Sequence, residues 1–237
     1  MRSAILLLAG ASSCLVEGHG EISVSVAPSS MTSDAFTTSD GWRVDFSAVY
    51  FSLSSLEITD RRGEAQRVSG VFAGHEYTTS IVYAEVESGL IPIVVELAPP
   101  SPGAPGSPAS ALAEGDASLL VEGTLTRDVK TIEFRWALPV RGRWDCSDEI
   151  QTAFDTPVLY EFLIAAERLF VVDPSQHDAY ELDPAPEFLG LDAFEAAESD
   201  ADRVLTQEEL EDAGLWSALV ERAPTVIVAL DDCASLD

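Results

Sequence analysis

Oxygen-bearing side chains are regularly spaced in residues 198–209, ESDADRVLTQEE. Calcium takes about six to eight oxygen ligands, and a twelve-residue loop supplies them from its first, third, fifth, seventh, ninth and twelfth positions. In this segment those positions hold Glu198, Asp200, Asp202, the backbone carbonyl of Val204, Thr206 acting through a water molecule, and Glu209 as a bidentate carboxylate. The spacing therefore predicts a calcium site.

The segment resembles an EF-hand or dockerin-type calcium loop, in which Leu205 stands where such loops carry an aliphatic residue. It departs from that pattern at two positions. Glu198 replaces the usual opening aspartate, and Arg203 occupies the position of a glycine, so a residue with a Cβ must adopt a positive φ there. Arg203 also brings a positive charge beside the ion. We therefore expect weak binding, nearer the millimolar than the micromolar end of the range.

The same residues have a second interpretation that needs no ion. Thr206 and Glu209 have the spacing of a capping box, in which the threonine hydroxyl accepts a hydrogen bond from a helix amide and the glutamate reaches back. Acidic residues at a helix start are also stabilised by the helix dipole. Under this interpretation the segment keeps a helix-loop-helix shape without a metal. The sequence leaves both interpretations open.

The elements that position this loop are predicted from hydrophobic periodicity. Phe188, Leu191 and Phe194 recur three residues apart, which predicts a helix from Glu187 onward, and a second helical pattern starts near Thr206. Apolar residues at every second position predict half-buried strands. These runs lie in residues 42–50, 91–97, 119–125 and 132–138, with weaker ones in residues 22–26 and 81–83.

Two segments are less regular. The alternation slips by one residue at Tyr50 and Phe51, which predicts a bulge or a bend. Residues 158–172 combine a strand-like first half with a helix-like Ala165 to Arg168, and we favour a strand. Short strands separated by Gly, Pro and Asp predict a mainly β fold, an antiparallel β-sandwich with a small acidic helix-loop-helix at its C-terminus.

The chain divides into three parts in this interpretation. Residues 1–13 form a signal peptide, and residues 14–185 form the β-sandwich domain. Residues 186–237 form an acidic helical segment that contains the loop 198–209. The proline-rich stretch 99–108, PPSPGAPGSP, is expected to be an exposed, semi-extended loop inside the sandwich domain.

The first residues have the order of an export signal. A basic start at Arg2 precedes the apolar run 4–11, and Ser12, Ser13 and Cys14 follow. This order resembles the signal of a bacterial lipoprotein, although Ala11 replaces the usual leucine. The resemblance implies an exported protein in the periplasm or on the cell surface, held to the membrane by a lipid on Cys14. Ordinary signal cleavage without a lipid is the alternative.

Cysteine usage agrees with export. Setting Cys14 aside leaves Cys146 and Cys233 as an even pair, which predicts a disulfide. Closing a loop of that length stabilises a fold by roughly 4 to 5 kcal/mol. Two unpaired, buried thiols are the alternative.

Charge excludes whole classes of partner. The 237 residues include 13 Lys and Arg against 41 Asp and Glu, which gives a net charge of −28. A nucleic acid would be repelled, because such binding rests on basic residues that neutralise phosphates. Residues 145–237 alone hold 24 acidic and 3 basic residues. A cation site, a solvated acidic surface and adaptation to salt each account for such an excess.

Sequence motifs offer little support for catalysis. The histidines His19, His75 and His177 lack the close spacing of zinc ligands and are expected in surface or loop positions. No nucleophile elbow or phosphate-binding loop is present. The sequence therefore favours a non-catalytic binding or structural module of the cell envelope that calcium stabilises. The alternative is a secreted hydrolase that uses two carboxylates about 5 to 10 Å apart.

A wider resemblance agrees with the first interpretation. The order of a signal ending in cysteine, the TSDGW segment 38–42, Asp145 followed by Cys146, the calcium-type loop and a C-terminal cysteine is similar to that of secreted bacterial lipoproteins without an assigned activity. Such proteins are expected to carry metal-binding histidines near the strand before the acidic part. Residues 165–168 contain none.

Overall fold

The structure is a computed structural model that describes residues 19–87, 89–101, 107–147, 151–152, 157–179, 186–231 and 233–236. The predicted signal peptide 1–13, the predicted lipidation site Cys14 and residues 102–106 of the proline-rich stretch lie outside the described residues. Among the described helices, none is long and apolar enough to cross a membrane.

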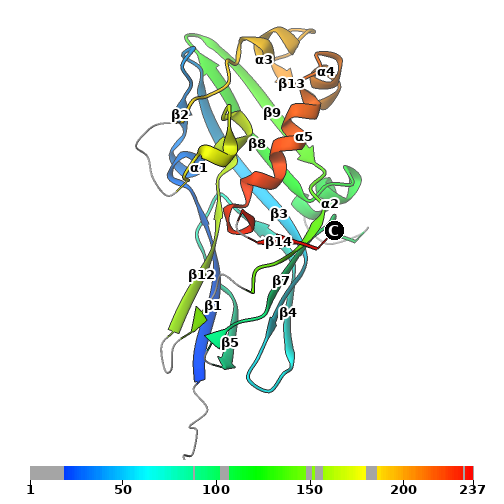
Figure 1. The fold of residues 1–237 in the computed structure, drawn as a ribbon. Coiled ribbons are helices and arrows are strands. Elements are labelled where there is room, and N and C mark those ends of the chain that lie inside the picture. The colour runs from blue at the N-terminus through cyan, green and yellow to red at the C-terminus, as the bar shows by residue number, and fades with distance from the viewer. Residues whose placement is uncertain are drawn as a thin grey trace, which may run out of the picture.

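Two multi-strand sheets make up most of the fold (Figure 1). In the described chain the larger sheet has nine strands in the order β13-β9-β8-β3-β7-β10-β14, with β2 and β4 also paired to β3. Its strands are β2 (Phe36–Thr37), β3 (Arg43–Thr59), β4 (Ala65–Ala73), β7 (Ile93–Leu97), β8 (Leu119–Arg127), β9 (Lys130–Leu138), β10 (Gly142–Asp145), β13 (Val204–Leu205) and β14 (Ala234–Ser235).

The smaller sheet has the order β12-β1-β5, and β6 and β11 form a separate pair. These strands are β1 (His19–Pro28), β5 (Thr78–Glu87), β6 (Gly89–Leu90), β11 (Gln151–Thr152) and β12 (Pro157–Ile164). The pairs β1–β12 and β13–β9 are parallel, and the other pairs are antiparallel. The predicted mainly β, sandwich-like fold is confirmed.

Short helices complete the fold. They are α1 (Ser30–Asp34), α2 (Ser107–Glu114), α3 (Asp192–Ala197), α4 (Gln207–Asp212) and α5 (Trp216–Arg222), with 3-10 helices η1 (Ala166–Phe170), η2 (Pro174–Gln176), η3 (Ala223–Val226) and η4 (Val228–Leu230). In Figure 1, α3 and α4 lie at one end of the molecule, and β4 of the larger sheet and β5 of the smaller sheet lie toward the other end. The same figure shows α5 over the sheet that carries β8 and β9, and its Leu219 belongs to the same buried cluster as Trp136.

Strand β3 is 17 residues long, and its pairing register shifts along its length. The register against β8 shifts between Phe46 and Ala48, and the register against β7 shifts between Leu53 and Ser55. A shift of one residue moves side chains to the other face of a sheet. The predicted irregularity is thus confirmed, but it lies on both sides of Tyr50 rather than at that residue.

Three local predictions need correction. Residues 158–164 are a strand, as favoured, but Ala166–Phe170 forms the 3-10 helix η1. Pro108 belongs to α2 and not to an extended loop, since a proline in the first turn removes only an amide that has no helical partner. The predicted helix from Glu187 begins only at Asp192.

One buried apolar cluster extends from the N-terminal strand to the C-terminal turns. It includes Trp136 of the larger sheet, Phe162 of the smaller sheet, Phe194 of α3 and Leu210 of α4. The acidic helical segment therefore packs on the same core as the strands. Cys146 and Cys233 form the predicted disulfide, so the alternative of two unpaired thiols is wrong.

Candidate metal site

The acidic loop is held against the larger sheet by its middle. Val204 and Leu205 form β13, which pairs in parallel with Glu133 and Phe134 of β9. The amide of Glu133 donates to the carbonyl of Arg203 at 2.8 Å, and Leu205 is fully buried. The indole Nε1 of Trp136 donates to the carbonyl of Leu205 at 3.1 Å. The loop is therefore an edge strand of the sheet at this point, with a helix on either side.

Three carboxylates of the loop converge. Glu198, Asp200 and Asp202 each offer an oxygen, and these oxygens lie within 4.8 Å of one another. Each carboxylate also accepts a hydrogen bond from a loop amide, Glu198 from Arg203 at 3.0 Å, Asp200 from Asp202 at 3.1 Å and Asp202 from Val204 at 2.7 Å. Such hydrogen bonds from backbone amides hold the carboxylates in place and leave oxygen lone pairs for a cation. The donor set suits a hard cation such as calcium.

The backbone of the loop turns as sharply as the calcium-loop pattern requires. Arg203 has φ of 70° and Ala201 has φ of 63°, both in the left-handed region that favours glycine. The expectation that Arg203 takes a positive φ is therefore confirmed. Its amide then points back to Glu198. The side chain of Arg203 is exposed.

The other predicted ligands lie outside this cluster. Thr206 is the N-cap of α4, and Thr206 with Glu209 forms a capping box, as the second interpretation predicted. Both oxygens of Glu209 are engaged, one by the amide and hydroxyl of Ser199 and the other by the amide and hydroxyl of Thr206. Val204 lies in β13 and donates its amide to Asp202. The capping interpretation thus applies to Glu209, and Glu198, Asp200 and Asp202 form the candidate metal site.

Hydrogen bonds to Glu209 change its acidity. The amides of Thr206 and Ser199 lower the pKa of Glu209 from 4.5 to about 2. A group whose pKa is depressed on folding stabilises the fold fully above its unfolded pKa, and this stability is lost as the pH falls through the folded value.

We expect the replacement Glu209→Gln to remove this pH-dependent stability. Wild type and variant should differ by about 1 to 2 kcal/mol above about pH 5, after allowance for solvent screening, and the difference should be lost as the pH falls through about 2. Urea unfolding at several pH values measures it. Glu208→Gln removes the same charge from an exposed neighbour and should show no such trend. A difference that is constant with pH would contradict the prediction.

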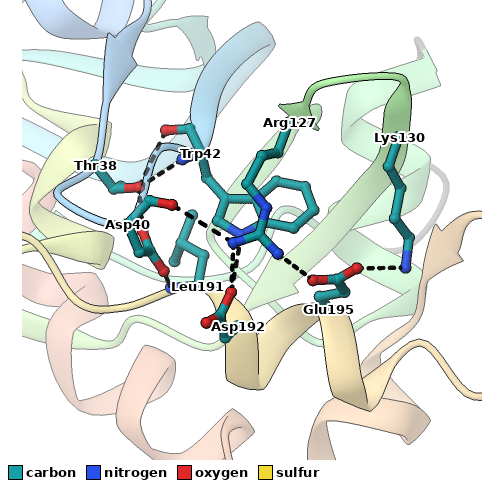
Figure 2. Close-up of polar contacts among 8 residues, drawn as sticks. All are labelled: Thr38, Asp40, Trp42, Arg127, Lys130, Leu191, Asp192 and Glu195. Carbon is teal, nitrogen blue, oxygen red and sulfur yellow. Dashed lines mark hydrogen bonds and ion pairs between the residues drawn. The ribbon is translucent and has the colours of Figure 1, made fainter.

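A second polar network positions α3, the helix before the loop (Figure 2). Arg127, at the end of β8, lies over the ring of Trp42 at 4.5 Å from its centroid. Its two Nη atoms bond Asp192 and Glu195 of α3, each at 2.6 Å. The hydrogen bond from Arg127 lowers the pKa of Asp192. Lys130 of β9 also contacts Glu195, at 3.0 Å.

The TSDGW segment supports this network. Thr38 donates to Asp40 at 2.6 Å and accepts the amide of Trp42 at 3.1 Å. Asp40 in turn accepts the amide of Leu191, directly before α3 (Figure 2). The segment therefore holds the backbone at the start of α3. This role could not be predicted from the sequence, because Asp40 and Leu191 are about 150 residues apart.

The predicted histidine positions are partly confirmed. His177 follows η2 in a loop, as expected, but its side chain is buried, with Nε2 3.3 Å from Glu167. Glu167 also accepts hydrogen bonds from the hydroxyls of Ser29 and Thr32. These contacts join α1, η1 and the loop after η2 in the core. His75 lies in the loop between β4 and β5, as expected, and its Nδ1 is 3.0 Å from the carbonyl oxygen of Val49.

A surface pocket of about 540 Å³ lies between β3, β4 and the start of α2. The described residues of its lining include Ser52, Ser69, Pro99 and Ala109, and none of them is a carboxylate or a histidine. This pocket does not supply the acidic pair that the hydrolase alternative requires.

Comparisons with known proteins do not extend these observations. No protein-family model, no curated protein and no solved structure gave a significant match to the chain. The residues and their geometry alone therefore carry the functional argument.

Proposed function

We propose that the protein is a non-catalytic binding or structural module of the cell envelope whose C-terminal loop takes up calcium. The observation that supports the metal site is the convergence of Glu198, Asp200 and Asp202 within 4.8 Å. With three carboxylates and no ion, the loop carries mutual repulsion that a divalent cation relieves. The loop joins α3 to α4, so a bound ion stabilises the packing of both helices on the sheet.

The ligand set of this proposal is smaller than the calcium-loop pattern suggests. The three converging carboxylates are the direct ligands, and water completes the coordination. Glu209 keeps its capping role, because its oxygens already accept four hydrogen bonds. Fewer protein ligands agree with millimolar affinity. Weak binding suits an exported protein, since extracellular calcium modules occupy that range.

Export and membrane attachment form the other half of the proposal. The disulfide between Cys146 and Cys233 is compatible with an exported protein, because such bonds persist in oxidising compartments. We infer from residues 1–14 that the chain is secreted and acylated at Cys14, with the folded module in the periplasm or at the cell surface. The net charge of −28 argues against a nucleic acid as its partner.

Calcium is expected to raise the thermal midpoint of the purified protein. Binding to the native state alone adds about 1.4 kcal/mol when calcium is at ten times its dissociation constant. For a chain of this size that corresponds to a rise of roughly 3 to 5 °C. Melts in about 10 mM calcium and in a chelator measure it.

Paired variants make this experiment specific. Asp200→Asn removes one converging carboxylate and should abolish the response to calcium. Asp212→Asn removes the same charge from an exposed position of α4 and should keep it. Magnesium should be less effective, because it demands a stricter octahedral shell. An equal calcium shift in Asp200→Asn, or no shift in the wild type, would refute the metal site.

A further inference from the structure

The only lysine of the chain lies beside the acidic loop. Lys130 Nζ is 3.0 Å from Oε1 of Glu195 and 4.0 Å from Oε2 of Glu198. Glu195 belongs to α3, and Glu198 opens the loop. Figure 2 shows Lys130 reaching from the β9 side toward Glu195. The ammonium therefore lies between α3 and Glu198, the first of the three converging carboxylates.

Glu198 is the least exposed member of that cluster. Its side chain is only 5% exposed, whereas Asp200 and Asp202 are exposed. Oε1 accepts the amide of Arg203, and Oε2 accepts no hydrogen bond within the described part of the chain. A carboxylate that is largely withdrawn from water is unfavourable unless a positive charge compensates it. Lys130 is the charged neighbour of Glu198, with Nζ 4.0 Å from Oε2.

The position of Lys130 is determined by neighbouring contacts. Arg127 contacts one oxygen of Glu195 at 2.6 Å, and Lys130 contacts the other at 3.0 Å. Lys130 also starts β9, the strand whose Glu133 amide binds the loop at Arg203. The loop and the lysine are therefore attached to the same strand. The ammonium is a compact point charge, and its side chain is 38% exposed.

We propose that Lys130 is a built-in counter-ion that competes with calcium for the loop and sets its affinity. This inference rests on the calcium site proposed above. In the metal-free loop the ammonium offsets the charge of Glu195 and Glu198 and so replaces part of what a metal would supply. When calcium binds, the like charge of Lys130 opposes it, and the salt of the medium screens that repulsion.

The test compares the calcium affinities of charge variants. Lys130→Gln should bind calcium about tenfold more tightly than the wild type at low ionic strength, as the loss of a nearby positive charge requires. The gain should shrink as sodium chloride is raised, because the interaction is screened. Isothermal titration of each purified protein with calcium chloride measures both effects. Thermal melts in chelator establish that each variant is folded before titration.

Two controls isolate the position of the charge. Lys130→Arg keeps the charge and should retain an affinity near that of the wild type. Arg67→Gln removes one positive charge from β4, where Arg67 is paired with Glu57 and is 67% exposed. Figure 1 places β4 at the end of the sheet opposite α3 and α4. An increase in affinity with Arg67→Gln as large as with Lys130→Gln would assign the effect to net charge and overturn the inference.

The remaining outcomes separate this inference from the proposed function. If wild type and Lys130→Gln bind calcium equally, the counter-ion role is wrong and the metal site stands. If only Lys130→Gln binds calcium, the counter-ion role stands, and in the wild type the ammonium of Lys130 neutralises the loop carboxylates in place of calcium. If neither binds at about 10 mM calcium, both proposals are wrong.

Discussion

Replacing Cys146 and Cys233 together by alanine should lower the free energy of unfolding by about 4 to 5 kcal/mol. The bond joins residues 87 positions apart, so it removes much of the chain entropy of the unfolded state. In the fold it secures β14, which pairs with β10 at the edge of the larger sheet beside the two cysteines. Thermal midpoints should fall by roughly 10 to 15 °C for a chain of this length.

Reduction of the wild type provides the matched experiment. Wild type in a strong thiol reductant should unfold at nearly the midpoint of the double variant, whereas the variant should not respond to reductant. The free-thiol content of the unfolded chain, measured before and after reduction, should rise by two from this pair. A wild-type midpoint that is insensitive to complete reduction would show that the bond does not stabilise the fold.

Local burial patterns could be predicted from the sequence because they depend on neighbouring residues. The alternation through Val44 and Phe46 identified β3, and the run through Phe134 and Trp136 identified β9. Strand pairing could not be predicted in the same way. β1 pairs in parallel with β12, more than 130 residues later, and an alternating strand does not indicate its partner. The sandwich was predictable, but its two parallel pairs were not.

The acidic loop 198–209 likewise has features that could be predicted from the sequence and features that could not. The spacing of Glu198, Asp200 and Asp202 predicted carboxylates that converge, because they share one turn of the chain. The sequence could not decide between the metal and capping roles of Glu209, since both need an acidic residue at that position. Lys130 could not be assigned at all. Its relation to Glu198 arises from the docking of β13 on β9, which the local pattern does not contain.

Phe170 connects the larger sheet to the helix that precedes the loop. Its ring is fully buried, with centroids 6.0 Å from Trp136 of β9 and 6.0 Å from Phe194 of α3. Phe46 and Phe134 lie at 6.1 and 6.3 Å. Aromatic rings at these separations contribute beyond the area they bury. Phe170 of η1 is therefore one of the contacts that position α3, together with Arg127 and Asp40.

Phe170→Ala should accordingly destabilise the fold by about 3 to 5 kcal/mol, since it removes a buried ring that its neighbours cannot replace. Phe170→Leu retains most of the volume and should cost clearly less, which gives a graded result even if the alanine variant does not fold. Tyr77→Ala removes an aromatic ring that is 57% exposed and should change the stability by less than about 1 kcal/mol. Urea unfolding of the three variants measures these differences. If the loss for Phe170→Ala were no larger than that for Tyr77→Ala, the link between sheet and helix would not depend on this ring.

The same substitution should affect the proposed calcium site. Because α3 carries Glu195 and leads into Glu198, the folded Phe170→Leu variant should bind calcium more weakly than the wild type.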